Sequence, residues 1–212
     1  RFVPASTSKI PHTLIALETG AVSGPDEVFE WDDQKRFVDS WNEDQTFADA
    51  FSRSTVWIYQ AVTPRIGSAA LRDWLADFDY GNADTGAPED VSQYWLKGPL
   101  AISAAEQVAF LSHLARRTLP LSARTYELAV PMMVMESGAG WTLYGKTGWK
   151  SVEGEADIGW FVGWLEQTGG EAPGTYAFAF NMDMSDPNAD VPKRKAAVMR
   201  ALSDLGALPA AE

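Results

Sequence analysis

Ser6 and Lys9, near the start of the chain, have the types and the spacing that suit nucleophilic catalysis. The apolar run at residues 14–17 and the following Gly20 predict that the pair opens a buried helix. Residues three positions apart share one face of a helix, so Lys9 should point the same way as Ser6. A serine hydroxyl beside an amine that can lose its proton is a candidate nucleophile. In isolation, however, this spacing more often marks a helix cap and a solvated lysine.

Two more short motifs follow this pair along the chain. Ser54, 48 positions after Ser6, lies at a predicted helix break with Val56 as an apolar neighbour, and it could relay a proton. The more ordinary interpretation is that Ser54 caps a helix. The sequence Tyr-Gly-Asn at residues 80–82 is typical of a turn and has little specificity of its own.

Two basic motifs lie in the C-terminal third of the chain. Lys146 and Thr147 come at the end of a predicted strand, where an amine and a hydroxyl could bind a substrate carboxylate, and Gly148 would let a ligand approach the backbone. Lys193 and Arg194 come at the start of the last predicted helix. The ordinary interpretations are a solvated strand end and surface charge, so neither motif identifies a site by itself.

The composition argues against several classes of function. With 17 basic and 29 acidic residues, the 212-residue chain has a net charge of −12, which argues against nucleic acid or an anionic membrane as a partner. The absence of cysteine excludes disulfides and thiolate chemistry. His12 and His113 lack the spacing of metal ligands, and we expect neither a metal nor an organic cofactor. No apolar run approaches the roughly 20 residues of a membrane span.

The pattern of apolar residues predicts helices first and strands afterwards. We expect helices at residues 46–67 with a break near 52–54, at 68–78, at 103–114 after a capping box, at 122–136 with a kink at Pro131, and at 192–205. We expect strands at 141–147, 157–166 and 175–184, and long loops at 21–44 and 80–102. The strand at 157–166 is apolar on both faces and should be central. This order predicts an α+β fold.

The motifs are far more specific together than apart. Their order along the chain is Ser-x-x-Lys at 6–9, Ser-x-Val at 54–56, Tyr-Gly-Asn at 80–82, Trp-Leu at 95–96 and Lys-Thr-Gly at 146–148. This order resembles the penicillin-recognising serine enzymes and, within that superfamily, the class D (oxacillinase-type) serine β-lactamases. Residues 1–7, 57–60 and 159–164 support the resemblance, which covers nearly the whole chain.

The resemblance implies one β-lactamase/transpeptidase-like domain over residues 1–212. Its helical part would cover about 6–136, and its antiparallel sheet and C-terminal helix about 137–212, with the site in the groove between them. The family's first helix and first strands precede the nucleophile, so we expect N-terminal strands to be missing here and one edge of the sheet to be unprotected. The resemblance also implies β-lactam substrates and a periplasmic or secreted location.

The reaction that the resemblance implies is hydrolysis of the β-lactam ring through an acyl-enzyme on Ser6. Lys9 would be the general base, as an N6-carboxylysine formed with CO₂ from bicarbonate, because an ordinary lysine pKa of about 10.4 is too high. Ser54 would pass a proton to the leaving nitrogen, and the indole of Trp95 would donate to the carbamate. The backbone N–H groups of Ser6 and Trp149 would form the oxyanion hole. Six residues would bind the substrate: Val56, Leu96, Lys146, Thr147, Gly148 and Arg194.

The chain departs from the family pattern directly before the lysine. The family carries an aromatic residue there, and this chain has Ser8. A large aromatic ring buries about 150–250 Å², far more than serine, so either a neighbour such as Tyr59 or Trp95 fills the space or water enters and CO₂ is lost more easily. We expect partial loss, so that turnover depends on added bicarbonate and Ser8→Phe reduces that dependence.

Two other functions fit parts of the sequence. A β-lactam sensor or a penicillin-binding transpeptidase shares these motifs and acylates without efficient turnover. A non-catalytic carbohydrate- or peptide-binding module would use several of the nine tryptophans. Against that module, Trp57, Trp74, Trp160 and Trp164 lie in apolar, core-like runs rather than in exposed strands or loops.

Overall fold

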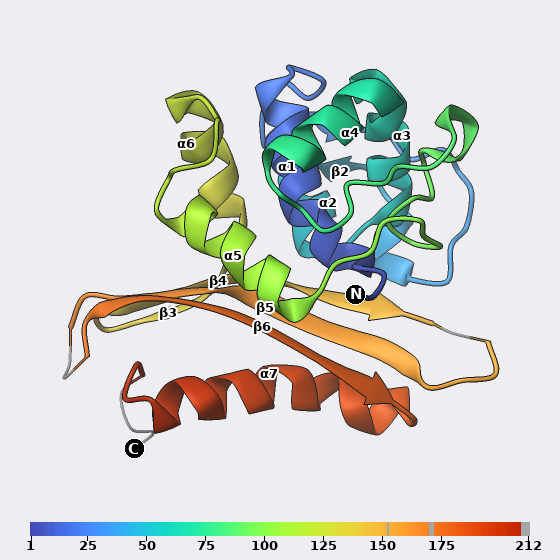
Figure 1. Ribbon diagram of the computed structural model, residues 1–212. Helices are drawn as coiled ribbons and strands as arrows, with labels where there is room; N and C mark the ends of the chain where they lie inside the picture. Colours follow the sequence, from blue (N-terminus) through green and yellow to red (C-terminus); the bar gives the residue numbers. More distant parts are fainter. Residues whose placement is uncertain (152, 170–171, 209–212) are drawn as a thin grey trace.

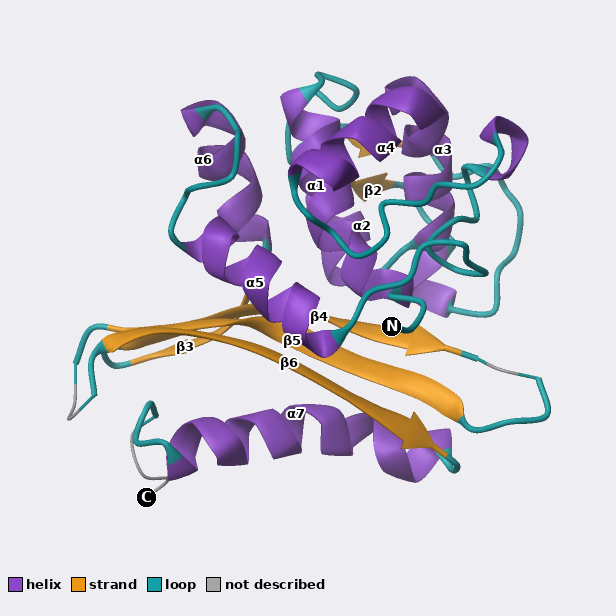
Figure 2. Cartoon of the chain, viewed as in Figure 1, coloured by secondary structure: helices purple, strands orange, loops and turns teal. Residues whose placement is uncertain are grey.

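A four-stranded antiparallel sheet separates one long helix from all the others (Figure 1). The protein is described by a computed structural model over residues 1–151, 153–169 and 172–208, so residues 209–212 of the predicted domain lie outside it. The strands, in their order across the sheet, are β3 (Val134–Gly138), β4 (Trp141–Lys150), β5 (Asp157–Gln167) and β6 (Gly174–Met184). Helix α7 (Pro187–Asp204) covers one face, and the other helices lie on the opposite face (Figure 2). The predicted α+β fold is confirmed.

The larger layer consists of short helices joined by long loops. Its elements are η1 (Ala5–Ser8), α1 (Lys9–Glu18), η2 (Asp39–Trp41), α2 (Phe47–Ser52), α3 (Val56–Ile66), α4 (Ser68–Asp77), η3 (Pro88–Asp90), α5 (Ala104–Ala115), α6 (Ala123–Met132) and the paired two-residue strands β1 (Val28–Phe29) and β2 (Gln45–Thr46). The chain breaks between α2 and α3, close to the predicted position. Helix α5 begins with the predicted capping box, in which the Ser103 hydroxyl accepts from the backbone N–H of Glu106.

Strand β5 is the central element of the fold, as its sequence predicts. Successive side chains of a strand point to opposite faces. Trp160, Val162 and Trp164 therefore enter the core beneath the helical layer, whereas Phe161 and Leu165 enter the smaller core beneath α7. All five side chains are fully buried. An apolar strand covered on both faces thus joins the two layers.

The prediction of a helix over residues 122–136 is wrong at its C-terminal end. Helix α6 ends at Met132, and β3 begins at Val134, where residue 134 pairs with Tyr144 of β4. Pro131 lies in the last turn of α6 instead of kinking a longer helix. Pairing between distant segments of the chain decides this boundary, and a local pattern does not contain that information. The sheet therefore begins three residues before the predicted position 137.

The closing helix also starts earlier than predicted. Helix α7 begins at Pro187 instead of Pro192, because the Asp186 carboxylate accepts from the backbone N–H of Asn188 and caps the helix. Pro187 occupies the first turn, where a missing N–H costs nothing, and Pro192 is accommodated inside the helix. The predicted end is close to the observed one, since Gly206 follows with a φ of +69°.

Two edges of the sheet lack a neighbouring strand within the described ranges. There β3 pairs only with β4, and β6 pairs only with β5. An open strand edge presents N–H and C=O groups that other chains can bind. We expect the unprotected edge to lower the solubility or the stability of the chain, and this stays a prediction.

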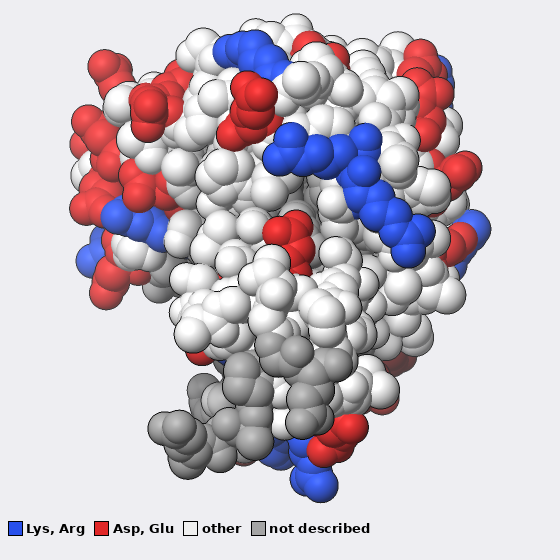
Figure 3. All heavy atoms as spheres, turned by 90° about the vertical axis from the view of Figure 1, so that its left-hand side faces the viewer, with Lys and Arg blue, Asp and Glu red and all other residues white. Residues whose placement is uncertain are grey.

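On the face of the molecule seen in Figure 3, acidic side chains gather along one margin and basic ones form small groups.

Close backbone contact between β4 and β5 positions the segment that carries the Lys-Thr-Gly motif. Gly145 faces Gly163 in the register, and a Cβ on Gly163 would lie only 2.0 Å from the carbonyl oxygen of Tyr144. Next to this contact, the rings of Tyr144 and Trp164 stack with centroids 4.6 Å apart. Only glycine permits this approach of the strands.

We expect Gly163→Ala to destabilise the protein by about 1–3 kcal/mol or more, as overpacking of a tight core does. The added methyl group has to push β4 away from β5, which also moves Lys146. Gly24→Ala is the control, because a Cβ there meets nothing within 4 Å. Urea unfolding of both variants checks the expectation. Equal midpoints for Gly163→Ala and Gly24→Ala would contradict the close contact.

Candidate active site

The Ser6 hydroxyl and the Lys9 amine meet where a 3-10 turn passes into a helix. Ser6 belongs to η1 and Lys9 begins α1, and Lys9 Nζ donates a hydrogen bond to Ser6 Oγ at 3.1 Å. The lysine is fully buried, whereas Ser6 lines a cavity. The structure therefore brings together a hydroxyl that a ligand can reach and an amine that water cannot.

The environment of Lys9 favours its neutral form. Burial lowers the pKa of the amine well below its usual value, and the positive charge of Lys146 lowers it further. Its Nζ lies 5.0 Å from the centroid of the Tyr59 ring. In the described part of the chain no carboxylate forms an ion pair with Lys9. A neutral amine beside a hydroxyl can accept its proton, which an ammonium group cannot do.

Ser54 faces the same cavity from the break between α2 and α3. The N-cap residue of α3 is Thr55, so the ordinary interpretation of Ser54 as a helix cap does not apply. Lys146 Nζ donates a hydrogen bond to Ser54 Oγ. Ser54 has a φ of +59°, and Ala5, directly before the nucleophile, has a φ of +49°. Such left-handed non-glycine residues are uncommon and concentrate at functional sites.

Lys146 is a second buried lysine in the site. Burial lowers its pKa to about 8, with a contribution from the charge of Arg194. The motif does not lie at a strand end as predicted, because β4 continues to Lys150. Lys146, Thr147 and Gly148 are therefore paired with β5 within the strand. This pairing fixes the backbone from which the lysine side chain extends.

Gly148 allows the nucleophile segment to approach the sheet. A Cβ on this residue would lie 2.9 Å from the carbonyl oxygen of Pro4 and 3.0 Å from Cγ2 of Thr7. The expectation from the sequence was that this glycine makes room for a ligand. Gly148 does line the cavity, but its closest neighbours belong to the turn that carries Ser6. The glycine thus sets the distance between β4 and the nucleophile.

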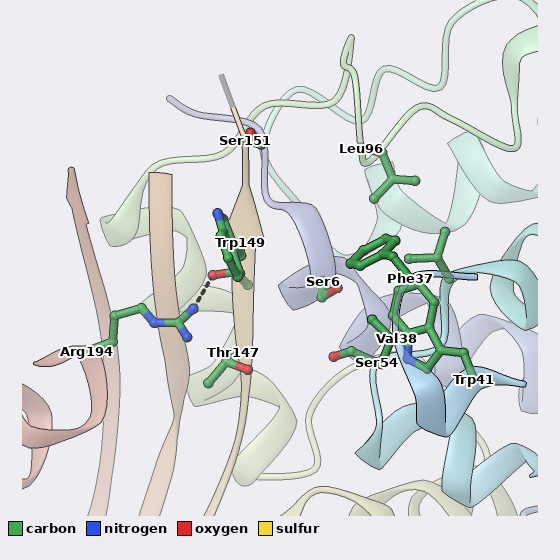
Figure 4. Close-up of a pocket in the computed structure, with 12 residues that line it drawn as sticks. Ser6, Phe37, Val38, Trp41, Ser54, Leu96, Thr147, Trp149, Ser151 and Arg194 are labelled. Carbon is green, nitrogen blue, oxygen red and sulfur yellow. Dashed lines mark hydrogen bonds between the residues drawn. The ribbon is translucent and has the colours of Figure 1, made fainter. Parts of the chain in front are cut away.

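Arg194 reaches the cavity from the opposite face of the sheet. It is 6% exposed, and its Nη1 donates to the carbonyl oxygen of Gly148 at 2.6 Å (Figure 4). Space for its side chain comes from Gly159, where a Cβ would lie 2.8 Å from Arg194 Cδ. Within the described ranges no carboxylate forms an ion pair with Arg194. The arginine is therefore buried and is not a surface charge, although its position at the start of the last predicted helix suggests one. It lines the cavity and can bind an anionic ligand there.

A cavity of about 620 Å³ is lined by Ser6, Ser54 and Arg194 together with other residues (Figure 4). Its lining residues are Ser6, Phe37, Val38, Trp41, Ser54, Val56, Leu96, Thr147, Gly148, Trp149, Ser151 and Arg194. The volume lies within the range of about 300–1,000 Å³ that small-molecule sites occupy. Of the predicted site residues, Lys9, Trp95 and Lys146 do not line the cavity and are buried. All the others line it directly.

The sequence interpretation missed four residues of the cavity wall. Phe37, Val38 and Trp41 belong to the long loop that the sequence predicts at 21–44, and Ser151 follows β4. Phe37 is 90% exposed, and the centroid of its ring lies 5.5 Å from that of the Trp41 ring. The sequence offers one indication of this role, namely the aromatic residues of the polar segment 21–44. Aromatic content alone does not indicate which part of the fold the segment covers.

Trp95 is buried beside His12, and its polar atom has no partner among the described residues. Its side chain is fully buried, and its Nε1 makes no hydrogen bond within the described structure. A buried donor that has no acceptor costs free energy unless a ligand or another group satisfies it. An acceptor in this part of the core would therefore be stabilised.

Ser8, the departure from the family pattern, is buried and hydrogen-bonded. It is 1% exposed, and its hydroxyl donates to the carbonyl oxygen of Ala5 at 2.7 Å. The hydroxyl therefore already has a partner in η1. Whether Ser8 weakens a carbamate on Lys9 stays a prediction.

Residues 80–82 support the site from outside the cavity. A Cβ on Gly81 would lie 2.3 Å from the carbonyl oxygen of Ala101, and the Asn82 amide bonds both Pro99 and Ala101. The Tyr80 hydroxyl accepts from Gln107, which also donates to Thr7 beside the nucleophile. These contacts tie the long loop to η1.

Over the described ranges, no three His, Cys, Asp or Glu residues are grouped so that they could hold a metal ion. In the same part of the chain, no helix has the length and apolar character needed to cross a membrane. The cavity offers a ligand hydroxyl groups, an arginine and an apolar wall.

Comparison with known proteins agrees with this geometry. Residues 1–204 match the family model of the penicillin binding protein transpeptidase domain. β-Lactamase OXA-2 of Salmonella typhimurium is 42% identical over 209 residues, which cover 99% of this chain and 72% of that protein. β-Lactamase OXA-48 of Klebsiella pneumoniae is 40% identical over 189 residues, which cover 89% of this chain and 68% of that protein.

Solved structures narrow the class further. The class D β-lactamase YbXI from Nostoc matches with a TM-score of 0.91 at 40% identity, over 97% of this chain and 83% of that one. FUS-1 (OXA-85), a class D β-lactamase from Fusobacterium nucleatum subsp. polymorphum, matches with a TM-score of 0.91 at 36% identity, over 99% and 84%. The fold and the site thus define a transpeptidase-type domain of the penicillin-recognising serine enzymes. Within that class, the chain belongs to the class D β-lactamases, and the resemblance inferred from the sequence is confirmed.

We expect the KM for a penicillin to rise above about pH 8, the pKa of Lys146, by up to about tenfold at pH 9. Lys146 is protonated below this pH and neutral above it, so its attraction for a substrate carboxylate fades as the pH rises. Steady-state kinetics between pH 6 and pH 9.5 measure the change. Lys146→Arg stays charged over this range and should remove the increase. A KM that is constant up to pH 9.5 in the wild-type enzyme would contradict this role.

Proposed function

We propose that the chain hydrolyses the β-lactam ring of penicillin-type antibiotics through an acyl-enzyme on Ser6. The observation that carries the proposal is the hydrogen bond of 3.1 Å between the fully buried Lys9 amine and the cavity-lining Ser6 hydroxyl. The relatives are β-lactamases by name, and their likeness covers nearly the whole chain.

In the acylation step, Ser6 Oγ attacks the lactam carbonyl carbon while the base at Lys9 takes its proton. The carbonyl oxygen becomes an oxyanion, which the backbone N–H groups of Ser6 and Trp149 would hold. Loss of one such donor typically costs about 10²–10³ in rate. As the C–N bond breaks, the nitrogen takes a proton from Ser54, whose hydroxyl is held by Lys146 and regains a proton from the base at Lys9. The position of Ser54 on the cavity wall supports this role.

The substrate carboxylate would bind on the β4 side of the cavity. Thr147 and Arg194 line the cavity there, and Lys146 adds a positive field from behind the wall. The planar guanidinium of arginine suits a carboxylate. Val56 and Leu96 supply apolar walls, and Phe37 and Trp149 lie at the cavity as further apolar surface.

CO₂ fits the surroundings of Lys9. The amine favours its neutral form, which is the form that reacts with CO₂, and Trp95 Nε1 offers a buried donor without a partner in the described structure. When bound to Lys9 as a carbamate, CO₂ would supply an anionic general base for both half-reactions. Trp95 would hold that group by donating from Nε1, and Val56 and Leu96 would keep water away. The burial of Lys9 supports this assignment.

Turnover of a chromogenic cephalosporin tests the proposal against its alternatives. A β-lactamase turns the substrate over steadily, whereas a sensor or a transpeptidase gives one stoichiometric burst. A carbohydrate- or peptide-binding module gives no reaction at all. Ser6→Ala should abolish both turnover and the mass shift of the acyl-enzyme, and turnover that survives this substitution would refute Ser6 as the nucleophile.

We also infer a periplasmic or secreted location from the resemblance to the family. The measurement is fractionation of cells that express the natural gene, followed by assay of each fraction. Activity confined to the cytoplasmic fraction would contradict the inference.

We expect Trp95→Ala to slow deacylation by roughly 10²-fold, because it removes a single donor to the catalytic base, while acylation proceeds with the neutral Lys9 amine taking the serine proton. Intact-mass spectra after mixing with penicillin should then show a long-lived acyl-enzyme. Trp74→Ala is the matched control, since Trp74 packs against Phe78 at the far side of the helical layer. If Trp95→Ala deacylates as fast as Trp74→Ala, the indole does not support the base.

A further inference from the structure

His12 lies one helical turn after Lys9, on the same face of α1, and the reaction described above does not use it. The side chain is fully buried. Its Nε2 lies 3.3 Å from Thr63 Oγ1, and that hydroxyl donates its own proton to the carbonyl oxygen of Tyr59 at 2.6 Å. Nε2 must therefore carry the hydrogen and donate to Thr63. Nδ1 is left as an acceptor, with no partner among the described residues.

The imidazole ring contacts both Tyr59, whose ring borders the Lys9 amine, and Trp95. Its centroid is 5.3 Å from that of Tyr59 and 5.2 Å from that of Trp95, and both contacts are edge-on, with interplanar angles of 72° and 80°. Tyr59 is the ring that lies 5.0 Å from Lys9 Nζ, and its hydroxyl is tied to Thr13 at 2.7 Å. His12 therefore connects an anchored ring to Trp95.

Acid–base chemistry does not account for His12. Burial lowers its pKa to about 3, so the ring is neutral at pH values well above 3. A neutral ring in this position places no positive charge beside the Lys9 amine. Its contribution to the site has to come from its shape and its contacts.

The orientation of Trp95 depends on such contacts. Its Nε1 makes no hydrogen bond within the described structure, so no polar contact fixes the direction in which the indole points. Edge-on contacts with His12 and with Tyr94, at 5.2 and 5.0 Å between centroids, are the aromatic contacts of the indole within the described residues. Tyr94 is the adjacent residue in the same loop. Of the two contacting residues, only His12 belongs to α1, the helix that begins with Lys9.

We propose that His12 is a positioning residue for Trp95: its ring, locked by Thr63 and seated against Tyr59, sets the direction of Trp95 Nε1 toward the Lys9 amine. This inference rests on the proposed function, in which Trp95 holds the CO₂ bound to Lys9. His12 does not contact the substrate in this account, and it acts only through the indole.

The test measures the bound CO₂ directly by ¹³C NMR, with ¹³C-bicarbonate titrated into the full chain. In His12→Ala, the bicarbonate concentration that half-saturates the carbamate signal should rise roughly tenfold, as expected from the loss of one or two aromatic contacts. His12→Phe keeps a ring of similar shape and should stay within about threefold of the wild-type value. The control is His113→Ala, because the other histidine is exposed and bonded to Thr118. Stoichiometric acylation by penicillin shows that each variant is folded.

A double-mutant cycle separates positioning from general packing. If His12 acts through the indole, His12→Ala adds little to the effect of Trp95→Ala, because the group that it positions is already gone. Additive effects, or a half-saturating concentration that His12→Ala leaves unchanged, would overturn the inference alone. A wild-type enzyme without any carbamate signal would overturn the proposed CO₂ chemistry, and the inference with it.

Discussion

The burial of one amine without a carboxylate partner is the constraint on which the site depends. A carboxylate beside Lys9 would raise its pKa and keep it charged, and an exposed lysine would be charged as well. The fold instead buries Lys9 in the helical layer with its amine at the Tyr59 ring, and it places the charge of Lys146 close enough to disfavour the ammonium form. Ser6 alone of this group reaches the cavity. The serine can therefore lose its proton to Lys9 because the burial of the lysine favours the neutral amine.

This arrangement needs a helix layer and a sheet that approach each other closely at one place. Gly148 lets the carbonyl of Pro4 and the side chain of Thr7 lie against β4, and Gly159 lets Arg194 pass from α7 to the cavity. At both positions a side chain would occupy space that the site uses. The glycines of β4 and β5 thus set distances between functional groups, in addition to the pairing of the strands.

The parts of the fold and the site that could be predicted from the sequence are those with a local signal. Ser6 and Lys9 share a helix face through their spacing, and the two-sided apolar pattern of β5 indicates a central strand. The turn of the chain at Val134 depends on pairing with β4, which lies later in the sequence. The path of Arg194 depends on an absent side chain at Gly159, and the place of Phe37 on the cavity depends on the course of a long loop. Each of these is a contact between distant segments, and neither periodicity nor local propensity encodes it.

The buried amine also carries a cost in stability. The unfolded chain binds a proton on Lys9 at every pH below its ordinary pKa of about 10.4, whereas the folded chain, whose Lys9 pKa is well below that value, binds the proton only at lower pH. Since the unfolded state then holds more protons, this residue lowers the stability of the fold progressively as the pH falls from 10 toward neutral. The fully apolar faces of β5 and the aromatic contacts around Tyr59, His12 and Trp95 offset that loss. A core of this size around the site is therefore what allows a lysine to remain neutral beside a nucleophile.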